Sequence, residues 1–323
     1  MPGPVLDSRM RIDVHNHFLP EPYVDALLDM DTAVGLESDG DQLYMRHQWS
    51  GTASVAGGNR IPVNPGFTDV EERVAWMDEY DIDRTLVSVS TPNPVSSAFT
   101  AEQSTELVRA INDGFAQAQS EHPDHIAGLG MLPLRDPDAA VAAVDRIAGD
   151  LDLPGIALPT GLPEGKLSDP ELRPAFDAID EYGLTAFVHP HGNVLSTMLE
   201  PEESFLNPLV VFPTDTTLQI ARLIYDGFFD DHEFDVVLSH MGGALLPLAG
   251  RLERGRREIS DPDARPDRPI LEYLQDCYYD TISFSRPTLQ AAIETVGVDQ
   301  FVFGTDYPFD EEDLETNLAD LET

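Results

Sequence analysis

Residues 12–18 read Ile-Asp-Val-His-Asn-His-Phe, and this stretch decides how the rest of the chain is interpreted. An apolar, β-branched run predicts a strand, and residues two apart in a strand point to the same face. His15 and His17 therefore share one face, where two neutral imidazoles suit zinc, iron or a similar transition metal. Taken alone, two histidines near an N-terminus are about as often a chance surface pair or a structural pair as a metal site. The metal hypothesis needs further ligands at the ends of other strands.

Three later apolar runs also end in residues that bind metals or transfer protons. They are the segments 185–188, 235–239 and 301–305, which lead directly into His189, His240 and Asp306. In a closed parallel barrel the carboxyl ends of all strands lie on one rim, which is where the active sites of such barrels sit. The sequence therefore predicts that these three side chains meet His15 and His17 on that rim.

The rest of the chain alternates apolar strand candidates with amphipathic segments, which is the pattern of a (β/α)8 TIM barrel. Helices are expected to begin near Thr68, where Thr68 and Glu71 form a capping-box pattern, and near Asp169. The 323 residues suffice for one barrel with insertions, and no repeat or linker divides them. We expect a single domain over residues 1–323. The strand candidates are 12–14, 85–89, 126–131, 155–158, 185–188, 236–239, 277–280 and 301–303.

Two long insertions interrupt this alternation. Residues 20–67 follow the first strand, and residues 192–213 follow the fifth. Loops of this length inside a compact domain are usually functional or disordered. Because both follow strands that carry proposed ligands, we expect them to cover the metal and shape the substrate pocket.

The motifs at the strand ends resemble those of the amidohydrolase superfamily, over about residues 11–309. The resemblance is greatest to the branch of 2-amino-3-carboxymuconate-6-semialdehyde decarboxylase and the ortho-hydroxybenzoate decarboxylases. It implies that four residues, His15, His17, His189 and Asp306, hold a divalent metal, for which zinc is expected, and that His240 is the acid/base group. The motifs are Asp13-Val14-His15-Asn16-His17, Val188-His189-Pro190, Ser239-His240-Met241-Gly242-Gly243 and Gly304-Thr305-Asp306-Tyr307-Pro308-Phe309.

One absence predicts that the site holds a single metal. Two-metal members of the superfamily bridge their ions with a carboxylated lysine on a middle strand, whereas the fourth strand here ends in Ala157-Leu158-Pro159-Thr160. Lys166 is the only lysine of the chain and lies beyond a loop rich in Gly and Pro. We therefore expect one divalent metal for each chain.

The resemblance also implies residues that bind the substrate. Arg60 matches a position that binds a substrate carboxylate, and Arg251 matches a second such arginine that family dimers supply from the neighbouring subunit, so a homodimer is expected. A guanidinium suits a carboxylate because it donates two parallel hydrogen bonds. Arg60 can also be a solvated loop residue and Arg251 an exposed helix residue. His191 stands where the family has an aromatic residue, and it is expected to bind substrate, hydrogen-bond solvent or face the pocket wall.

The leading functional hypothesis is metal-dependent, non-oxidative decarboxylation of a small unsaturated or aromatic carboxylic acid. His240 or Asp306 would move the proton, and the sequence does not choose between them. The alternative is metal-dependent hydrolysis of a lactone, amide or related bond. A third possibility is a catalytically silent barrel used for binding or as a scaffold, which the intact set of three histidines and an aspartate argues against.

Composition predicts the environment in which the protein works. The formal net charge is −40 and the pI is near 4.2, with one lysine among 19 basic residues. Such self-repulsion is screened by concentrated salt, so we expect a salt-loving organism, and the same charge disfavours nucleic acid and anionic membranes as partners. No apolar run is long enough to span a bilayer. Because Cys277 is alone and cannot form an internal disulfide, a cytoplasmic location is expected.

Overall fold

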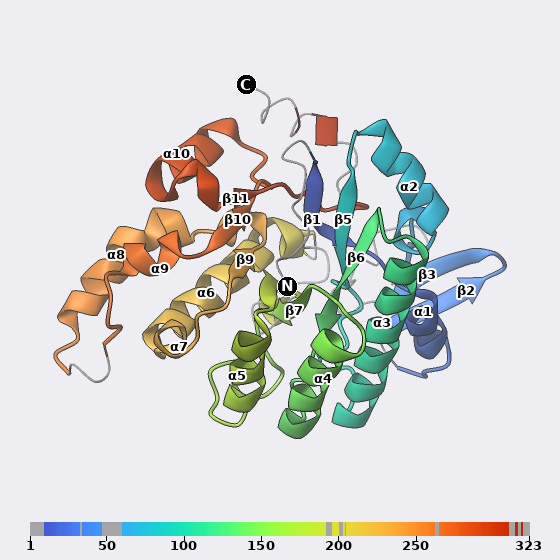
Figure 1. The fold of residues 1–323 in the computed structure, drawn as a ribbon, viewed down its shortest axis with the longest axis horizontal. Helices are drawn as coiled ribbons and strands as arrows, with labels where there is room; N and C mark the ends of the chain where they lie inside the picture. Colours follow the sequence, from blue (N-terminus) through green and yellow to red (C-terminus); the bar gives the residue numbers. More distant parts are fainter. Residues whose placement is uncertain are drawn as a thin grey trace.

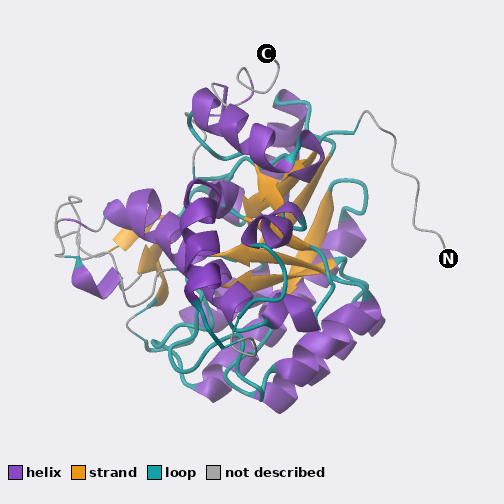
Figure 2. Ribbon diagram, turned by 90° about the vertical axis from the view of Figure 1, so that its left-hand side faces the viewer, coloured by secondary structure: helices purple, strands orange, loops and turns teal. Residues whose placement is uncertain are grey.

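A computed structural model of the chain describes residues 10–32, 34–46, 60–191, 196–199, 203, 205–261, 265–309, 314–315 and 318. Eight parallel strands form one sheet, and the helices lie around its outside (Figures 1 and 2). This is the predicted (β/α)8 barrel, and each of the eight predicted strands is present. Their bounds are β1 Ile12–His17, β5 Arg84–Ser88, β6 Ile126–Met131, β7 Gly155–Pro159, β8 Thr185–His189, β9 Val236–Leu238, β10 Tyr278–Asp280 and β11 Phe301–Val302.

The barrel closes between its last strand and its first. The backbone N–H of Val14 donates to the carbonyl of Phe303 (2.9 Å), and that of His17 donates to the carbonyl of Tyr307 (2.8 Å). The segment 303–307 thus continues β11 along β1 and brings Asp306 beside the two histidines of β1. Closure of the ring, rather than proximity in the sequence, unites residues almost 300 positions apart.

Helices cover the outer face of the barrel. Two glycines of β6 allow unusually close packing there, because a Cβ on Gly128 would lie 2.5 Å from Phe115 and one on Gly130 would lie 2.6 Å from Ile147. Phe115 comes from α3 and Ile147 comes from α4, so both helices pack closely against the sheet. The helices are α1 Glu21–Leu28, α2 Val70–Glu79, α3 Ala101–Glu121, α4 Pro137–Gly149, α5 Arg173–Tyr182, α6 Phe212–Tyr225, α7 Phe228–Asp231, α8 Leu245–Glu258, α9 Ile270–Gln275 and α10 Arg286–Val296.

One predicted capping box and one predicted helix start are wrong, although α2 does begin near Thr68. The N-cap of α2 is Asp69, whose side chain accepts from two backbone N–H groups of the first turn, so Thr68 and Glu71 form no capping box. Helix α5 begins at Arg173 rather than near Asp169, because the Asp169 carboxylate accepts from the backbone N–H of Lys166 (2.8 Å) and closes a turn before the helix. A capping box does form at the start of α3.

The first insertion is more regular than a loop. Beyond α1 it contains a three-stranded antiparallel sheet, which projects from one side of the barrel (Figure 1). Its strands are β2 Gly35–Asp39, β3 Gln42–Arg46 and β4 Arg60–Pro62. The short helical segments are η1 Pro65–Phe67, η2 Ser196–Met198, the π-helix η4 Asn207–Val211, η5 His240–Gly242 and η7 Val298–Gln300. Among the described residues, no helix has the length and apolar character needed to cross a bilayer.

Candidate metal centre and active site

The five predicted residues meet at the carboxyl ends of the strands. His15 and His17 lie on β1, His189 is the last residue of β8, His240 follows β9 by two positions, and Asp306 lies beyond β11. His15 and His17 are fully buried, and His189 and Asp306 are less than a tenth exposed. The rule that strand ends carry the chemistry therefore places all five side chains correctly on one rim.

Their ligand atoms form a compact cluster around Asp306. One carboxylate oxygen of Asp306 lies 2.9 Å from Nε2 of His17 and 3.3 Å from Nε2 of His15, and the other lies 3.7 Å from Nε2 of His240. Single ligand atoms of His15, His189, His240 and Asp306 all lie within 4.8 Å of one another. This compact set includes His240 and not His17, whereas the predicted ligand set includes His17 and not His240. Both histidines lie close enough to Asp306 to be considered as ligands.

The cluster fits a divalent cation. Nε2 of His189 is buried without a hydrogen-bond partner among the described residues, and the described contact of the buried Nε2 of His15 is the 3.3 Å approach to Asp306. A buried polar atom left unpaired costs roughly 1–3 kcal/mol, so the nitrogen of His189 beside a carboxylate requires an explanation. Imidazole nitrogen and carboxylate oxygen are the donors that zinc and related ions prefer. The site is therefore a divalent metal centre of three histidines and one aspartate.

Protonation within the cluster also matches this reading. Burial disfavours the charged form of His15, but the carboxylates of Asp306 and Asp280 outweigh burial and raise the pKa of His15 to about 10. Burial lowers the pKa of His17 to about 4 and holds the pKa of His189 well below its ordinary value. Burial alone would raise the pKa of Asp306, yet the charge of His15 holds that pKa well below its ordinary value. Neutral imidazole and ionised carboxylate are the forms that bind metals, and a cation would replace the proton on His15.

Asp280, which was not among the predicted site residues, fixes the orientation of the cluster. One oxygen of Asp280 accepts from Nδ1 of His15 (2.6 Å) and from the backbone N–H of His240 (2.7 Å). The other accepts from the backbone N–H groups of Met241 (2.8 Å) and Ile282 (3.1 Å). With its Nδ1 proton held in this way, His15 directs Nε2 at the cluster, as carboxylate partners of metal-binding histidines do. Asp280 ends the seventh predicted strand, so the same strand-end rule could have found it.

The backbone is strained where it presents His240 and Asp306 to the cluster. His240, Met241 and Asp306 adopt left-handed conformations with φ of 51°, 54° and 62°. Such residues persist only where the surroundings hold them, and each costs of the order of 1–3 kcal/mol. Asp280 holds the first two through their N–H groups, and the carbonyl of His15 accepts from the N–H of Asp306 (2.8 Å).

A buried arginine holds the carboxyl end of β1 from outside the cluster. The guanidinium of Arg73, which is fully buried, donates to Oδ1 of Asn16 (2.8 Å), to the carbonyl of Gly66 (2.9 Å) and to the carbonyl of His17. It also lies 4.9 Å from the ring centre of Tyr307, beside the cis peptide bond Tyr307-Pro308. Arg73 thereby joins β1, the segment before α2 and the segment after β11.

A cavity of ≈680 Å³ opens above the cluster. Its wall is mostly apolar and includes Phe67, Phe212, Phe284 and Phe309, while His189, His240 and Asp306 contribute polar atoms. Met45 and Ile61 come from the three-stranded sheet, and Pro208 and Leu209 come from η4. Both insertions therefore shape the cavity over the cluster, as expected from their positions in the sequence.

The three predicted substrate-binding residues differ in their position relative to the cavity. His191 is buried, lines the cavity, and has its pKa lowered to about 4 by burial. Arg251 is exposed on α8 and does not line the cavity. Arg60 is the first residue of β4, but its side chain lies outside what the structure describes. Lys166 forms an ion pair with Asp226 (3.3 Å) in a partly exposed position, and β7 ends at Pro159.

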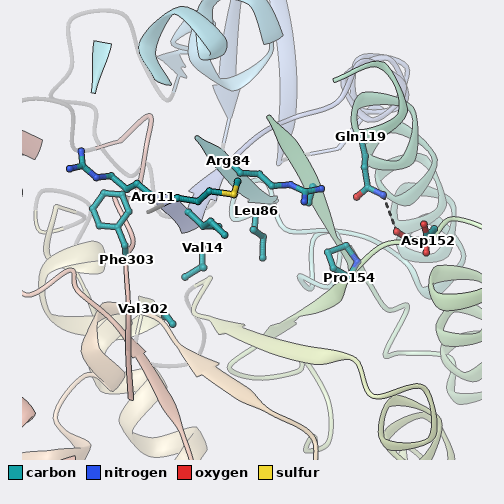
Figure 3. A pocket seen from close by; sticks show the side chains of 12 residues that line it. Arg11, Val14, Arg84, Leu86, Gln119, Asp152, Pro154, Val302 and Phe303 are labelled. Atoms are coloured by element: carbon teal, nitrogen blue, oxygen red, sulfur yellow. Dashed lines mark hydrogen bonds between the residues drawn. The ribbon is translucent and has the colours of Figure 1, made fainter. Parts of the chain in front are cut away.

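A second cavity, of ≈830 Å³, lies at the opposite end of the barrel (Figure 3). It is lined by residues at the amino ends of strands, among them Ile12, Arg84 and Pro154. In barrels of this type the amino ends contribute to stability, whereas the carboxyl ends carry the active site. None of the predicted site residues lines this second cavity.

Comparison with known proteins agrees with the site. A family model described as amidohydrolase matches residues 12–322. The 2-amino-3-carboxymuconate-6-semialdehyde decarboxylase of Dictyostelium discoideum is 27% identical over 312 residues, covering 93% of this chain and 82% of that protein. A gamma-resorcylate decarboxylase of Rhizobium sp. (strain MTP-10005) is 27% identical over 255 residues, covering 75% and 78%. The crystal structure of Metarhizium anisopliae IDCase in apo form superposes with a TM-score of 0.85 at 26% identity, covering 97% of this chain and 91% of that one.

Proposed function

The chain belongs to the amidohydrolase family, and we propose that it is a metal-dependent decarboxylase that removes carbon dioxide from a small aromatic carboxylic acid without oxidation. The observation that carries the proposal is the buried cluster of histidines and Asp306 at the base of an apolar, aromatic-walled cavity. The 2-amino-3-carboxymuconate-6-semialdehyde and gamma-resorcylate decarboxylases among its relatives support decarboxylation over hydrolysis of a lactone or amide. The enzyme class is thus a carboxy-lyase.

His15, His17, His189 and Asp306 would hold one divalent ion, which we propose to be zinc. When bound, the ion supplies a Lewis acid that binds and polarises a substrate oxygen. His15 is oriented for this task by Asp280, and His17 by the hydroxyl of Ser88, 3.2 Å from its Nδ1.

His240 is the proposed acid/base group. Its ring lines the cavity, and its Nδ1 is buried without a partner among the described residues. In the reaction a proton is added to the ring carbon that bears the carboxylate, the bond between that carbon and the carboxylate breaks, and its electron pair stays on the ring as carbon dioxide leaves. His240 would supply this proton, since Asp306 is proposed to bind the metal.

The two arginines are proposed to orient the carboxylate, with Arg251 reaching the site from the second chain of a homodimer. Arg251 is exposed and has no ion-pair partner among the described residues, although the chain carries a net charge of −40. Its helical neighbours Arg254 and Arg257 both pair with glutamates. Arg60 would act from β4 of the same chain.

Carbon dioxide release tests the function directly. A panel of hydroxybenzoates, lactones and amides is incubated with the metal-loaded protein, and released carbon dioxide is compared with released acid. Decarboxylation predicts carbon dioxide without hydrolysis, and acid release without carbon dioxide would favour the alternative. Elemental analysis gives the metal and its number for each chain, and two tightly bound ions or manganese instead of zinc would contradict the finer proposal.

Mixing two inactive variants tests the shared site. His240→Ala and Arg251→Ala chains are combined under conditions of subunit exchange. A mixed dimer contains one site with both groups intact, so activity should reappear. No recovery despite demonstrated exchange would contradict the contribution of Arg251 across an interface. We further propose an enzyme of a salt-loving organism, because the large negative charge requires screening. A cytoplasmic location is proposed because Cys277 is the only cysteine of the sequence.

A further inference from the structure

Two buried polar atoms in the cavity wall belong neither to the metal cluster nor to the hydrogen bonds that orient it. Ser90 is 5% exposed and His191 is 9% exposed, and both line the cavity. Ser90 Oγ and His191 Nδ1 have no hydrogen-bond partner among the described residues. Because an unpaired buried polar atom costs roughly 1–3 kcal/mol, such atoms in a binding cavity point to a partner on the ligand.

The barrel places these atoms beside the cluster but outside it. Ser90 follows the end of β5 by two residues, and His191 follows the end of β8 by two residues. The last residue of β8 is His189, a proposed metal ligand. Ser90 and His191 line the same cavity as His189, His240 and Asp306, so a molecule that fills the cavity down to the cluster can contact them with a group other than the one at the metal.

The cavity wall restricts what that separate group can be. Neither lysine nor arginine is among the described residues that line the cavity, so none of these residues offers a charge to compensate a second carboxylate. Phe67 and Phe309 pack edge to face with ring centres 4.8 Å apart, and such a wall suits a flat aromatic ring. A serine hydroxyl donates and accepts hydrogen bonds, and an imidazole does the same through its two nitrogens. A phenolic hydroxyl, which also donates and accepts, matches both.

We propose that Ser90 and His191 form a neutral hydrogen-bonding subsite that selects aromatic acids bearing a ring hydroxyl separate from the groups bound at the metal. This inference rests on the proposed function, because it assumes an aromatic acid at the cluster. It assigns His191 a role in specificity.

The test compares two acids that differ by one hydroxyl. 2,6-Dihydroxybenzoate, which is gamma-resorcylate, and 2-hydroxybenzoate share the carboxylate and one neighbouring hydroxyl. Dissociation constants are measured by calorimetry with the metal-loaded protein in concentrated salt, for the wild type and for His191→Phe, Ser90→Ala and His191→Asn. Metal content and circular dichroism establish that each variant is folded and loaded.

The wild type should bind the dihydroxy acid about tenfold more tightly, which is the factor expected from one hydrogen bond. His191→Phe and Ser90→Ala should each reduce this preference towards unity while binding of 2-hydroxybenzoate changes little. His191→Asn, which still donates and accepts, should retain part of the preference. The inference is overturned if the wild type binds neither acid or shows no preference, or if the preference survives in both variants, as it would if the two atoms serve only to hold water. Failure of the proposed function is a different result, namely that no aromatic acid of the panel releases carbon dioxide.

Discussion

Replacing Asp280 by asparagine should disable the metal centre without touching a metal ligand. The carboxylate of Asp280 faces four N–H donors, two on each oxygen, and three of them belong to the backbone and cannot reverse. Asparagine keeps one acceptor oxygen and replaces the other with an NH2 group. In one orientation the NH2 group faces the backbone N–H groups of Met241 and Ile282. In the other it faces the backbone N–H of His240 and the Nδ1 proton of His15. His15 can relieve its own clash only by moving its proton to Nε2, where the proton blocks a metal.

The size of the effect follows from these contacts. Hydrogen bonds to a charged group contribute about 1.5–3 kcal/mol each, so losing two should lower the free energy of unfolding by roughly 3–6 kcal/mol. Removing a carboxylate that orients a metal-binding histidine typically weakens metal binding about 10- to 100-fold. The left-handed backbone of His240 and Met241 also loses its support, so turnover should fall even when metal is supplied in excess.

Asp13→Asn is the matched control, because it changes another fully buried aspartate that accepts backbone N–H groups close to the cluster. One oxygen of Asp13 accepts from the N–H groups of His15 (3.1 Å) and Thr305 (3.1 Å), and the other accepts from the Thr305 hydroxyl (2.7 Å). A hydroxyl can reverse and accept, so asparagine retains all three contacts. Burial raises the pKa of Asp13 to about 6, so the substitution also removes a charge that burial disfavours. We expect a change in the free energy of unfolding below about 1 kcal/mol.

Chelator competition measures metal affinity, and urea denaturation of the metal-free chains measures stability. The reasoning would be refuted if Asp280→Asn bound metal within about threefold of the wild type, because loss of an orienting carboxylate should weaken metal binding about 10- to 100-fold. Equal losses in Asp280→Asn and Asp13→Asn would also refute it, because the argument depends on which donors can reverse.

The remaining predictions concern a buried cation, a glycine, the single thiol and the charge. Arg73→Met should lower the free energy of unfolding by roughly 3 kcal/mol or more in urea, since it leaves buried acceptors unpaired, and a loss below 1 kcal/mol would contradict this. Gly243→Ala should destabilise more than Gly183→Ala, because both have φ of +64° but only at Gly243 would a Cβ meet another atom, 2.0 Å from the carbonyl oxygen of Pro213; equal losses in thermal unfolding would argue against the clash. Burial raises the pKa of Cys277 to about 12, so at pH 8 the thiolate is scarcer in the folded protein than in the unfolded chain. A disulfide reagent should therefore react with Cys277 only as fast as the protein opens. Rapid reaction of the native protein would contradict this. The thermal unfolding midpoint should rise as potassium chloride increases from about 0.2 M to about 2 M, since salt screens the net charge of −40, and an unchanged midpoint would count against adaptation to salt.

Most of the barrel could be predicted because its signals are local. A short apolar run specifies a buried parallel strand, and the residue that ends the run lies on the active rim whatever the order of the strands. That rule alone predicted the positions of His15, His17, His189, His240 and Asp306. Helix starts were less secure, since Thr68 and Asp69 are both good N-cap residues and only the geometry of the preceding turn selects between them.

Tertiary structure decided what the local signals leave open. The bond between His15 and Asp280 joins residues 265 positions apart, and it exists because the barrel closes with β10 beside the ends of β9 and β11. Closure also brings His240 into the compact set around Asp306. Part of the first insertion forms a separate sheet that walls the cavity, where the sequence predicted only a loop. The sequence by itself determined that His15, His17, His189, His240 and Asp306 lie on one rim, because the end of a strand is a local property. Which of them touch, and which carboxylate orients them, depends on strand register around a closed ring, and no local pattern encodes it.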